Sequence, residues 1–182
     1  MQKSMIAAGI FVLAGILFLA ATFTTGWITN SSKRGSISVG FLSVKYCSKG
    51  ECESGKIRKD EIKLTGYALT TTGCLAAFAA GLAGLVIFMN KNRLKGNGAI
   101  VGTKVAAAIV SVLFVLGAVA LYFVYKEAGS RGGKMDLSFG YSFYVSVFAT
   151  ILVYAATFMP LEEEKLSTPA QAELPPQAPP AE

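Results

Sequence analysis

Charged residues divide the chain into four long uncharged stretches, and this pattern predicts the fold class. Each stretch is rich in Leu, Ile, Val, Ala and Phe. A helix needs about 20 apolar residues to cross the hydrocarbon core of a bilayer, so each stretch is long enough for one crossing and too short for two. The pattern predicts an all-α membrane protein, a bundle of four transmembrane helices. The stretches are residues 4–32, 64–90, 105–125 and 137–161, and the predicted helices lie near residues 5–27, 66–89, 100–125 and 141–160.

Two alternatives to this interpretation are weaker. A soluble protein with four buried helices would need long helices that are apolar on every face. A cleaved signal peptide could explain the first stretch, because Lys3 precedes its apolar run, but the run is about twice as long as a signal core. We therefore expect an uncleaved membrane anchor. Aromatic residues near the predicted helix ends are expected to lie at the membrane interface. These are Trp27, Tyr67, Tyr122, Tyr125, Tyr141 and Tyr144.

Composition supports the membrane assignment and narrows the function. Hydrophobic residues make up 53% of the 182 residues. Charged residues make up only 15%, against about 25% in average soluble chains. The chain has no histidine, which removes the commonest general base and the commonest zinc ligand. We therefore expect no enzyme, with no catalytic, cofactor-binding or metal-binding residues, and neither a nucleic acid nor a small-molecule substrate as partner.

The helices are also expected to carry no ionisable side chain, because the stretches that predict them contain none. Pumps, secondary transporters and many pores place ionisable groups inside the bilayer. Helices without such groups favour a structural bundle. An oligomeric small channel or transporter is the alternative function.

Small residues recur at a spacing of four along the second predicted helix, which places each set on one helix face. Such faces allow two helix backbones to approach closely. We expect them to pack inside the bundle, with a dimer contact as the alternative. The residues are Gly73, Ala77 and Gly81 on one face, Ala76, Ala80 and Gly84 on another, and Gly98 and Gly102 at the start of the third helix.

Residues 1–160 are predicted to form the transmembrane domain, and residues 161–182 a disordered tail. All six prolines fall in residues 160–182, together with Ala, Gln and Glu. Such a composition cannot bury enough apolar surface to fold. Three loops connect the helices, and only the first, residues 28–65, is long enough to hold structure of its own.

The first loop contains a strand pattern followed by two cysteines. Residues 36–46 alternate and are rich in β-branched and aromatic side chains, which predicts one or two short strands. A four-residue turn that contains Gly50 separates Cys47 from Cys52. A hairpin of this length can bring the two thiols close enough for a disulfide, and free thiols are the alternative. Cys74, in the second helix, is expected to behave as a small buried apolar residue.

Two signals for the orientation of the bundle disagree. With cytoplasmic termini, six Lys and Arg residues lie inside and eleven lie outside, so the positive-inside rule favours the opposite orientation. A disulfide needs an oxidising compartment, which favours an extracellular first loop. A basic cluster in the short second loop, residues 90–99, favours the same orientation. We expect a plasma-membrane protein with both termini in the cytoplasm.

A tryptophan after the first helix, a Gly-x-Leu element and two cysteines in the first loop carry a family resemblance. These residues are Trp27, Gly40-Phe41-Leu42, Cys47 and Cys52. With the four-helix layout, they resemble the claudin and peripheral myelin protein superfamily of four-transmembrane (tetraspan) proteins. Phe41 or Leu42 replaces the second tryptophan of that pattern, and the chain lacks the Tyr-Val type terminus of claudins. It therefore resembles a divergent claudin-like tetraspan, and other four-helix families with a disulfide-bonded loop remain alternatives.

The resemblance implies a left-handed four-helix bundle that carries a small extracellular β-sheet, built mainly from the first loop and pinned by Cys47 and Cys52. Such proteins act in adhesion, barriers and cell junctions, or as accessory subunits of channels and receptors. The implied partners are membrane lipid and other membrane proteins, including a second copy of the chain. The first loop carries eight basic and four acidic residues, a net charge of +4. This charge would strengthen binding to an acidic partner, and solvation of an exposed loop explains it equally well.

Overall fold

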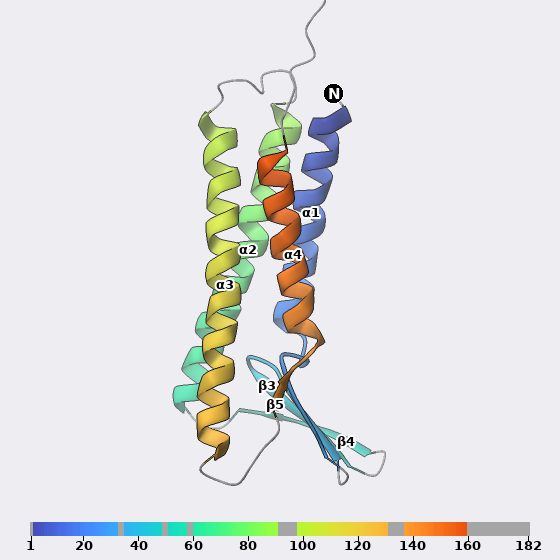
Figure 1. Cartoon of the computed structure of the whole chain (residues 1–182), viewed down its shortest axis with the longest axis vertical. Coiled ribbons are helices and arrows are strands. Elements are labelled where there is room, and N and C mark those ends of the chain that lie inside the picture. Colours follow the sequence, from blue (N-terminus) through green and yellow to red (C-terminus); the bar gives the residue numbers. More distant parts are fainter. Residues whose placement is uncertain are drawn as a thin grey trace, which may run out of the picture.

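The structure, a computed structural model, describes residues 2–32, 35–48, 51–57, 60–90, 98–130 and 137–159. Over this part of the chain, four α-helices stand side by side and a five-stranded antiparallel sheet lies at one end of them (Figure 1). The predicted tail, residues 161–182, and most of the second loop lie outside the described residues. The fold is mostly helical, with four long apolar helices, as the hydrophobic pattern predicts.

Each of the four helices contains a segment long and apolar enough to cross a membrane. At 1.5 Å per residue, α1 and α4 are roughly 33 and 27 Å long, close to the hydrocarbon thickness of about 30 Å. The other two helices, α2 and α3, are longer, at roughly 45 and 50 Å. Their additional turns run beside the sheet (Figure 1). The helices are α1 (Gln2–Phe23), α2 (Asp60–Met89), α3 (Gly98–Ser130) and α4 (Tyr141–Phe158).

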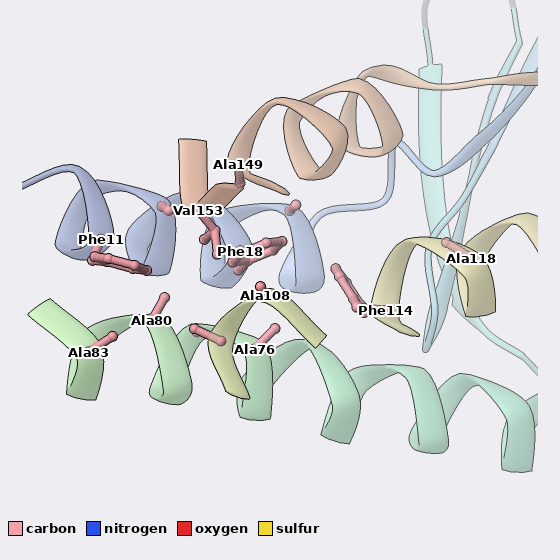
Figure 2. Close-up of a cluster of buried hydrophobic side chains, with 14 of the residues drawn as sticks. Phe11, Phe18, Ala76, Ala80, Ala83, Ala108, Phe114, Ala118, Ala149 and Val153 are labelled. Atoms are coloured by element: carbon pink, nitrogen blue, oxygen red, sulfur yellow. The ribbon is translucent and has the colours of Figure 1, made fainter. Parts of the chain in front are cut away.

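The helices pack as a ring in which α1 contacts α2 and α4, and α3 contacts the same two helices. Alanines line the helix contacts, and Ala76, Ala80 and Ala83 of α2 are fully buried. In Figure 2, Phe11 of α1 lies opposite Ala80 and Ala83, and the ring of Phe18 meets Phe114 of α3 edge to face. Small side chains on α2 therefore leave room for the large rings of α1 between the helix backbones.

The surface of the bundle has the side-chain distribution of a membrane protein. Alanines are buried, whereas large apolar side chains such as Leu116, Phe148 and Ile151 are more than half exposed. In water, such an arrangement would be unfavourable by about 25 cal/mol for each Å² of apolar surface left exposed. Against lipid tails this exposure carries little penalty, and close packing through small residues stabilises the bundle. By the length, composition and surface of its helices, the chain is a multi-pass membrane protein.

The sheet has the strand order β4-β3-β2-β1-β5, and every neighbouring pair is antiparallel. Four strands come from the first loop and the fifth comes from the third loop. The predicted strand region, residues 36–46, covers most of β2 and β3. The strands are β1 (Ile28–Ser32), β2 (Gly35–Val39), β3 (Ser43–Ser48), β4 (Glu51–Lys56) and β5 (Leu137–Phe139).

Two expectations about single residues are wrong. Trp27 is 3% exposed, so it belongs to the protein core and not to the membrane interface. Lys104 lies inside α3 and is 8% exposed, although the helices were expected to carry no ionisable side chain. Its ammonium group donates a hydrogen bond of 3.5 Å to the carbonyl of Met159, directly after α4. Carbonyls at a helix C-terminus lack partners in their own helix and attract cations, which explains a lysine at this position.

Candidate functional site

A buried aromatic cluster joins the sheet to the helices. The ring of Trp27 stacks on Phe41 with a centroid distance of 4.3 Å, and both rings meet Phe114 of α3 edge to face. The indole Nε1 of Trp27 donates a hydrogen bond of 2.7 Å to the carbonyl of Ala21, near the end of α1. This carbonyl lies in the last turn of α1, where no N–H of a following helical turn is available as donor, and it accepts from the indole and from the hydroxyl of Thr24 at 2.9 Å. The cluster therefore fixes the first loop on the bundle.

The turn between β2 and β3 brings Phe41 into the aromatic cluster. The backbone N–H of Gly40 donates to the carbonyl of Ser43 at 2.8 Å, which closes the turn. The backbone N–H of Trp27 donates to the carbonyl of Val39 at 3.1 Å, which ties the turn to the end of α1. Backbone hydrogen bonds and ring stacking therefore hold Phe41 from both sides.

Glycines allow this turn to lie close against the helices. A Cβ atom added to Gly40 would lie 2.9 Å from the carbonyl oxygen of Thr24. A Cβ added to Gly66 of α2 would clash with the carbonyl oxygen of Phe41. The half-buried Leu42 packs against the same core. Of the residues that carry the family resemblance, Trp27 and Gly40-Phe41-Leu42 therefore meet at the junction of sheet and bundle, whereas Cys47 and Cys52 lie in the hairpin β3–β4.

A second aromatic stack holds β5 between α3 and α4. The ring of Tyr122 stacks on Phe139 of β5 at 4.2 Å, and Phe139 stacks on Phe143 of α4 at 4.1 Å. The hydroxyl of Tyr122 donates a hydrogen bond of 3.0 Å to the carbonyl of Leu137. Tyr122 therefore supports the sheet, although it was expected to anchor the helix at the membrane interface. The phenylalanines of this stack were missed from the sequence, where aromatic residues around the start of the fourth helix were the only signal.

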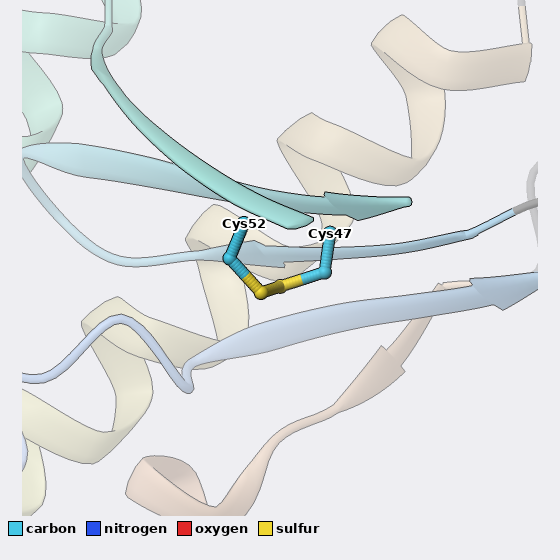
Figure 3. Close-up of a disulfide and its surroundings, with 2 residues drawn as sticks. All are labelled: Cys47 and Cys52. Carbon is cyan, nitrogen blue, oxygen red and sulfur yellow. A yellow bond between two sulfur atoms is a disulfide. The ribbon is translucent and has the colours of Figure 1, made fainter. Parts of the chain in front are cut away.

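Cys47 and Cys52 form a disulfide between directly opposite residues of β3 and β4 (Figure 3). The predicted disulfide is confirmed, and the alternative of two free thiols is not. All six residues of β4 are exposed, and β4 is an edge strand of the sheet. Pairing with β3 and the disulfide therefore hold β4 in place, because burial contributes nothing there.

One face of the sheet is apolar near the helices and acidic at the hairpin β3–β4. Side chains alternate between the two faces along each strand. Ile37 and Val44 are half-buried and pack against the core. Farther out on the same face, Tyr46 is 47% exposed and pairs directly with Glu53 on β4. We call this surface the tyrosine face, and its residues are Ile37, Val44, Tyr46, Glu51 and Glu53.

The opposite face of the sheet is polar and basic. Hydroxyl side chains from all the strands lie on it, together with the disulfide. Lys45 and Lys56 of the hairpin lie on this face and are exposed. We call this surface the serine face. Because Glu51 and Glu53 point to the tyrosine face, the two faces of one hairpin differ in the sign of their charge.

The small residues of the helices divide into two groups. A Cβ on Gly73 would lie close to the hydroxyl of Thr22, and a Cβ on Gly84 would lie 2.9 Å from the carbonyl oxygen of Ala8. These glycines face neighbouring helix α1, and Ala77 is also buried. At Gly81, Gly98 and Gly102 nothing lies within 4 Å of an added Cβ. Gly98 and Gly102 therefore face open space, contrary to the packing expectation. The backbone nitrogen of Gly81 does lie against α1, because it would be 3.6 Å from a Cβ added to Gly15.

An apolar groove of about 600 Å³ runs along the outside of α2 beside α1. Its lining includes Cys74, Ala77 and Gly81 together with larger side chains such as Leu19 and Phe78. Cys74 is free and half-buried, so it is more accessible than the sequence suggested. The groove lies at the height of the apolar helix segments and contains no charged side chain.

Neither a known protein family nor a curated protein matches this sequence. The resemblance to claudin-like tetraspans therefore stays a prediction from the residues named above.

Proposed function

We propose that the chain is a tetraspan of the plasma membrane with a structural or interaction role, a divergent claudin-like protein. It acts in adhesion, in a barrier or junction-like assembly, or as an accessory subunit, through the sheet of its disulfide-pinned first loop. The observation that carries this proposal is the hairpin β3–β4, in which every residue of β4 is exposed and yet fixed. Ordering a residue costs about 1–2 kcal/mol of backbone entropy, and burial does not offset that cost in β4. A rigid exposed segment of this kind suits recognition, because little order has to be gained on binding.

The tyrosine face supports a protein as the partner. Binding hot spots in protein interfaces are enriched in tyrosine and lie on an apolar base surrounded by polar residues. Tyr46 is about half exposed, and the half-buried Ile37 and Val44 lie beside it in the sheet. Glu51 and Glu53 supply an acidic rim along the edge strand. This arrangement favours a partner with a basic, partly apolar contact surface.

The disulfide supports an extracellular position for the sheet. Structural disulfides form and persist in oxidising compartments such as the cell exterior. The sheet lies where α1 ends and α2 begins, and the N-terminus lies at the other end of the bundle (Figure 1). Because the chain crosses the membrane four times, an extracellular sheet requires the start of α1 and the end of α4 to lie on the cytoplasmic side.

Site-specific photo-crosslinking in intact cells tests the proposed role. The full chain carries a photoreactive phenylalanine derivative at position 46 on the tyrosine face, or at position 116 on the lipid-facing side of α3. Leu116 is 58% exposed, so it provides a control with similar exposure in the apolar part of the bundle. We expect one defined set of membrane-protein adducts from position 46 and none of that set from position 116. Replacing both Glu51→Lys and Glu53→Lys is expected to remove these adducts.

Two results would contradict the proposal. One is the absence of protein adducts from position 46 in a chain that reaches the cell surface. The other is an adduct pattern that is the same at positions 46 and 116, because recognition through the sheet would then be unnecessary.

A further inference from the structure

The serine face carries a continuous row of polar side chains across the whole sheet. The strand register pairs Ser138 with Thr29, Thr29 with Ser38, Ser38 with Lys45, and Lys45 with Ser54. Neighbouring strands lie about 4.8 Å apart, so the row extends roughly 19 Å. The hydroxyl groups of Thr29 and Ser138 contact each other at 3.0 Å. The row is therefore a regularly spaced array of hydroxyl groups with one ammonium group.

The charge of this face is positive over the described strands. Lys45 and Lys56 lie diagonally across from each other on β3 and β4, and both are exposed. Within β1 to β5 as described, no carboxylate points to this face, because Glu51 and Glu53 alternate to the tyrosine face. Neither lysine forms an ion pair with a described residue. Two free ammonium groups next to a row of hydroxyls are suited to bind sulfate or carboxylate oxygens.

The chemistry of the serine face differs from that of a protein-binding surface. Protein interfaces are enriched in aromatic residues, Met and Arg, and are depleted in Ser and Lys. The serine face has the reverse composition, since Ser, Thr and Lys make up its row. A hydrated partner with many hydroxyl and anionic oxygens fits such a surface better than an apolar protein contact. Anionic polysaccharides have this chemistry and a repeating extended shape.

We propose that the serine face binds an anionic polysaccharide, such as the sulfated chains of a cell surface or extracellular matrix. Lys45 and Lys56 contact sulfate or carboxylate groups, and Ser38 and Ser54 bind neighbouring oxygens of the same chain. The biological role of this contact rests on the extracellular sheet of the proposed function. The binding chemistry does not, because the tyrosine face and the serine face are separate surfaces of one sheet.

Binding to immobilised heparin tests the proposal with the full chain in nanodiscs of zwitterionic lipid. The matched comparison is between two double variants that remove the same charge. Lys45→Gln with Lys56→Gln alters the serine face, whereas Lys63→Gln with Lys126→Gln alters exposed lysines on α2 and α3. We expect the first pair to weaken heparin binding by about tenfold or more and the second pair by roughly twofold. A third double variant, Ser38→Ala with Ser54→Ala, is expected to bind heparin more weakly than the wild-type chain although its charge is unchanged.

Equal losses from the two lysine pairs would overturn the proposal, because binding would then follow net charge alone. Unchanged heparin binding in the variant Ser38→Ala with Ser54→Ala would show that the hydroxyl row takes no part in the contact. Vesicles with phosphatidylserine serve as a competitor, and neutral dextran serves as the uncharged control. Competition by these vesicles that depends on Lys45 and Lys56 would assign the face to anionic lipid instead. If the chain does not bind heparin, the proposed function still stands, because photo-crosslinking from the tyrosine face in cells tests it separately.

Discussion

Gly66 lies where α2 passes the turn that carries Phe41, and a side chain has no room there. A Cβ at this position would clash with the backbone carbonyl of Phe41, so α2 or the turn has to shift. We predict that Gly66→Ala lowers the midpoint of thermal unfolding in detergent by several degrees, in line with overpacking costs of about 1–3 kcal/mol. Circular dichroism of the purified chain measures the midpoint.

Gly102→Ala is the matched control for this prediction, because Gly102 also lies in a helix and nothing is within 4 Å of its added Cβ. Alanine is favoured over glycine in helices by about 1 kcal/mol, so this variant is expected to keep or raise the unfolding midpoint. If Gly66→Ala were as stable as Gly102→Ala, the close contact between α2 and the turn would be refuted.

Trp27 is the only tryptophan of the chain, and its fluorescence therefore reports on the aromatic cluster. The ring is stacked on Phe41 and 3% exposed, so it is shielded from lipid. We predict that lipids with brominated acyl chains quench its emission only weakly. The comparison is the double variant Trp27→Phe with Phe23→Trp, because Phe23 is 66% exposed at the end of α1. Strong quenching in the wild-type chain would contradict the buried position and place Trp27 at the membrane interface, as the sequence suggested.

The sequence indicated Trp27 and the Gly40-Phe41-Leu42 turn, but it did not indicate Phe114 or Gly66, and it did not reveal what these residues do. Trp27 ends an apolar stretch, which is also where lipid-facing anchors occur, and only the contact with Phe41 separates the two roles. Lys104 lies within the predicted third helix, residues 100–125, but it was overlooked because only the uncharged stretch from residue 105 was searched for ionisable side chains. Its hydrogen bond to Met159 joins residues 55 positions apart, and such a pairing leaves no local signal.

At the scale of elements, the hairpin β3–β4 depends on its disulfide more than any helix does. β4 buries no side chain, and the six-residue loop closed by Cys47 and Cys52 contributes about 2 kcal/mol in the chain-entropy description. Reduction is therefore predicted to speed amide hydrogen exchange in β4 by roughly 30-fold while the helices stay protected. Mass spectrometry of the exchanged peptides measures both regions in the same sample.

The double variant Cys47→Ser with Cys52→Ser controls for effects of the reductant, because its exchange should not respond to reduction. Unchanged exchange in the wild-type hairpin after reduction would show that strand pairing alone holds β4. Faster exchange throughout the helices would show that the disulfide also supports the bundle, contrary to this account.

Only part of the sheet could be predicted from the sequence. Alternation in residues 36–46 indicated β2 and β3, because these strands bury one face and expose the other. β4 has no such pattern, since all its residues are exposed. β5 has three residues and exists through its pairing with β1 and the stack on Tyr122, which are contacts between distant parts of the chain.

At the scale of the whole molecule, the helices were predictable because lipid imposes a strong rule on sequence. Every crossing needs a long apolar segment, and the four uncharged stretches coincide with the four observed helices. Helix lengths were not predictable to the same degree. The outer turns of α2 and α3 extend beyond the apolar stretches and include charged residues such as Lys63 and Lys126.

The central claim is a disulfide-pinned sheet outside the cell on a four-helix membrane bundle. Labelling of intact cells with a membrane-impermeant maleimide, with and without prior treatment by an impermeant reductant, tests it most directly. The account predicts that label is incorporated only after reduction and only at Cys47 and Cys52. A chain with Cys74→Ala should label equally, because Cys74 lies within an apolar segment of α2. Labelling of the two cysteines only after permeabilisation would place the sheet in the cytoplasm and contradict the account.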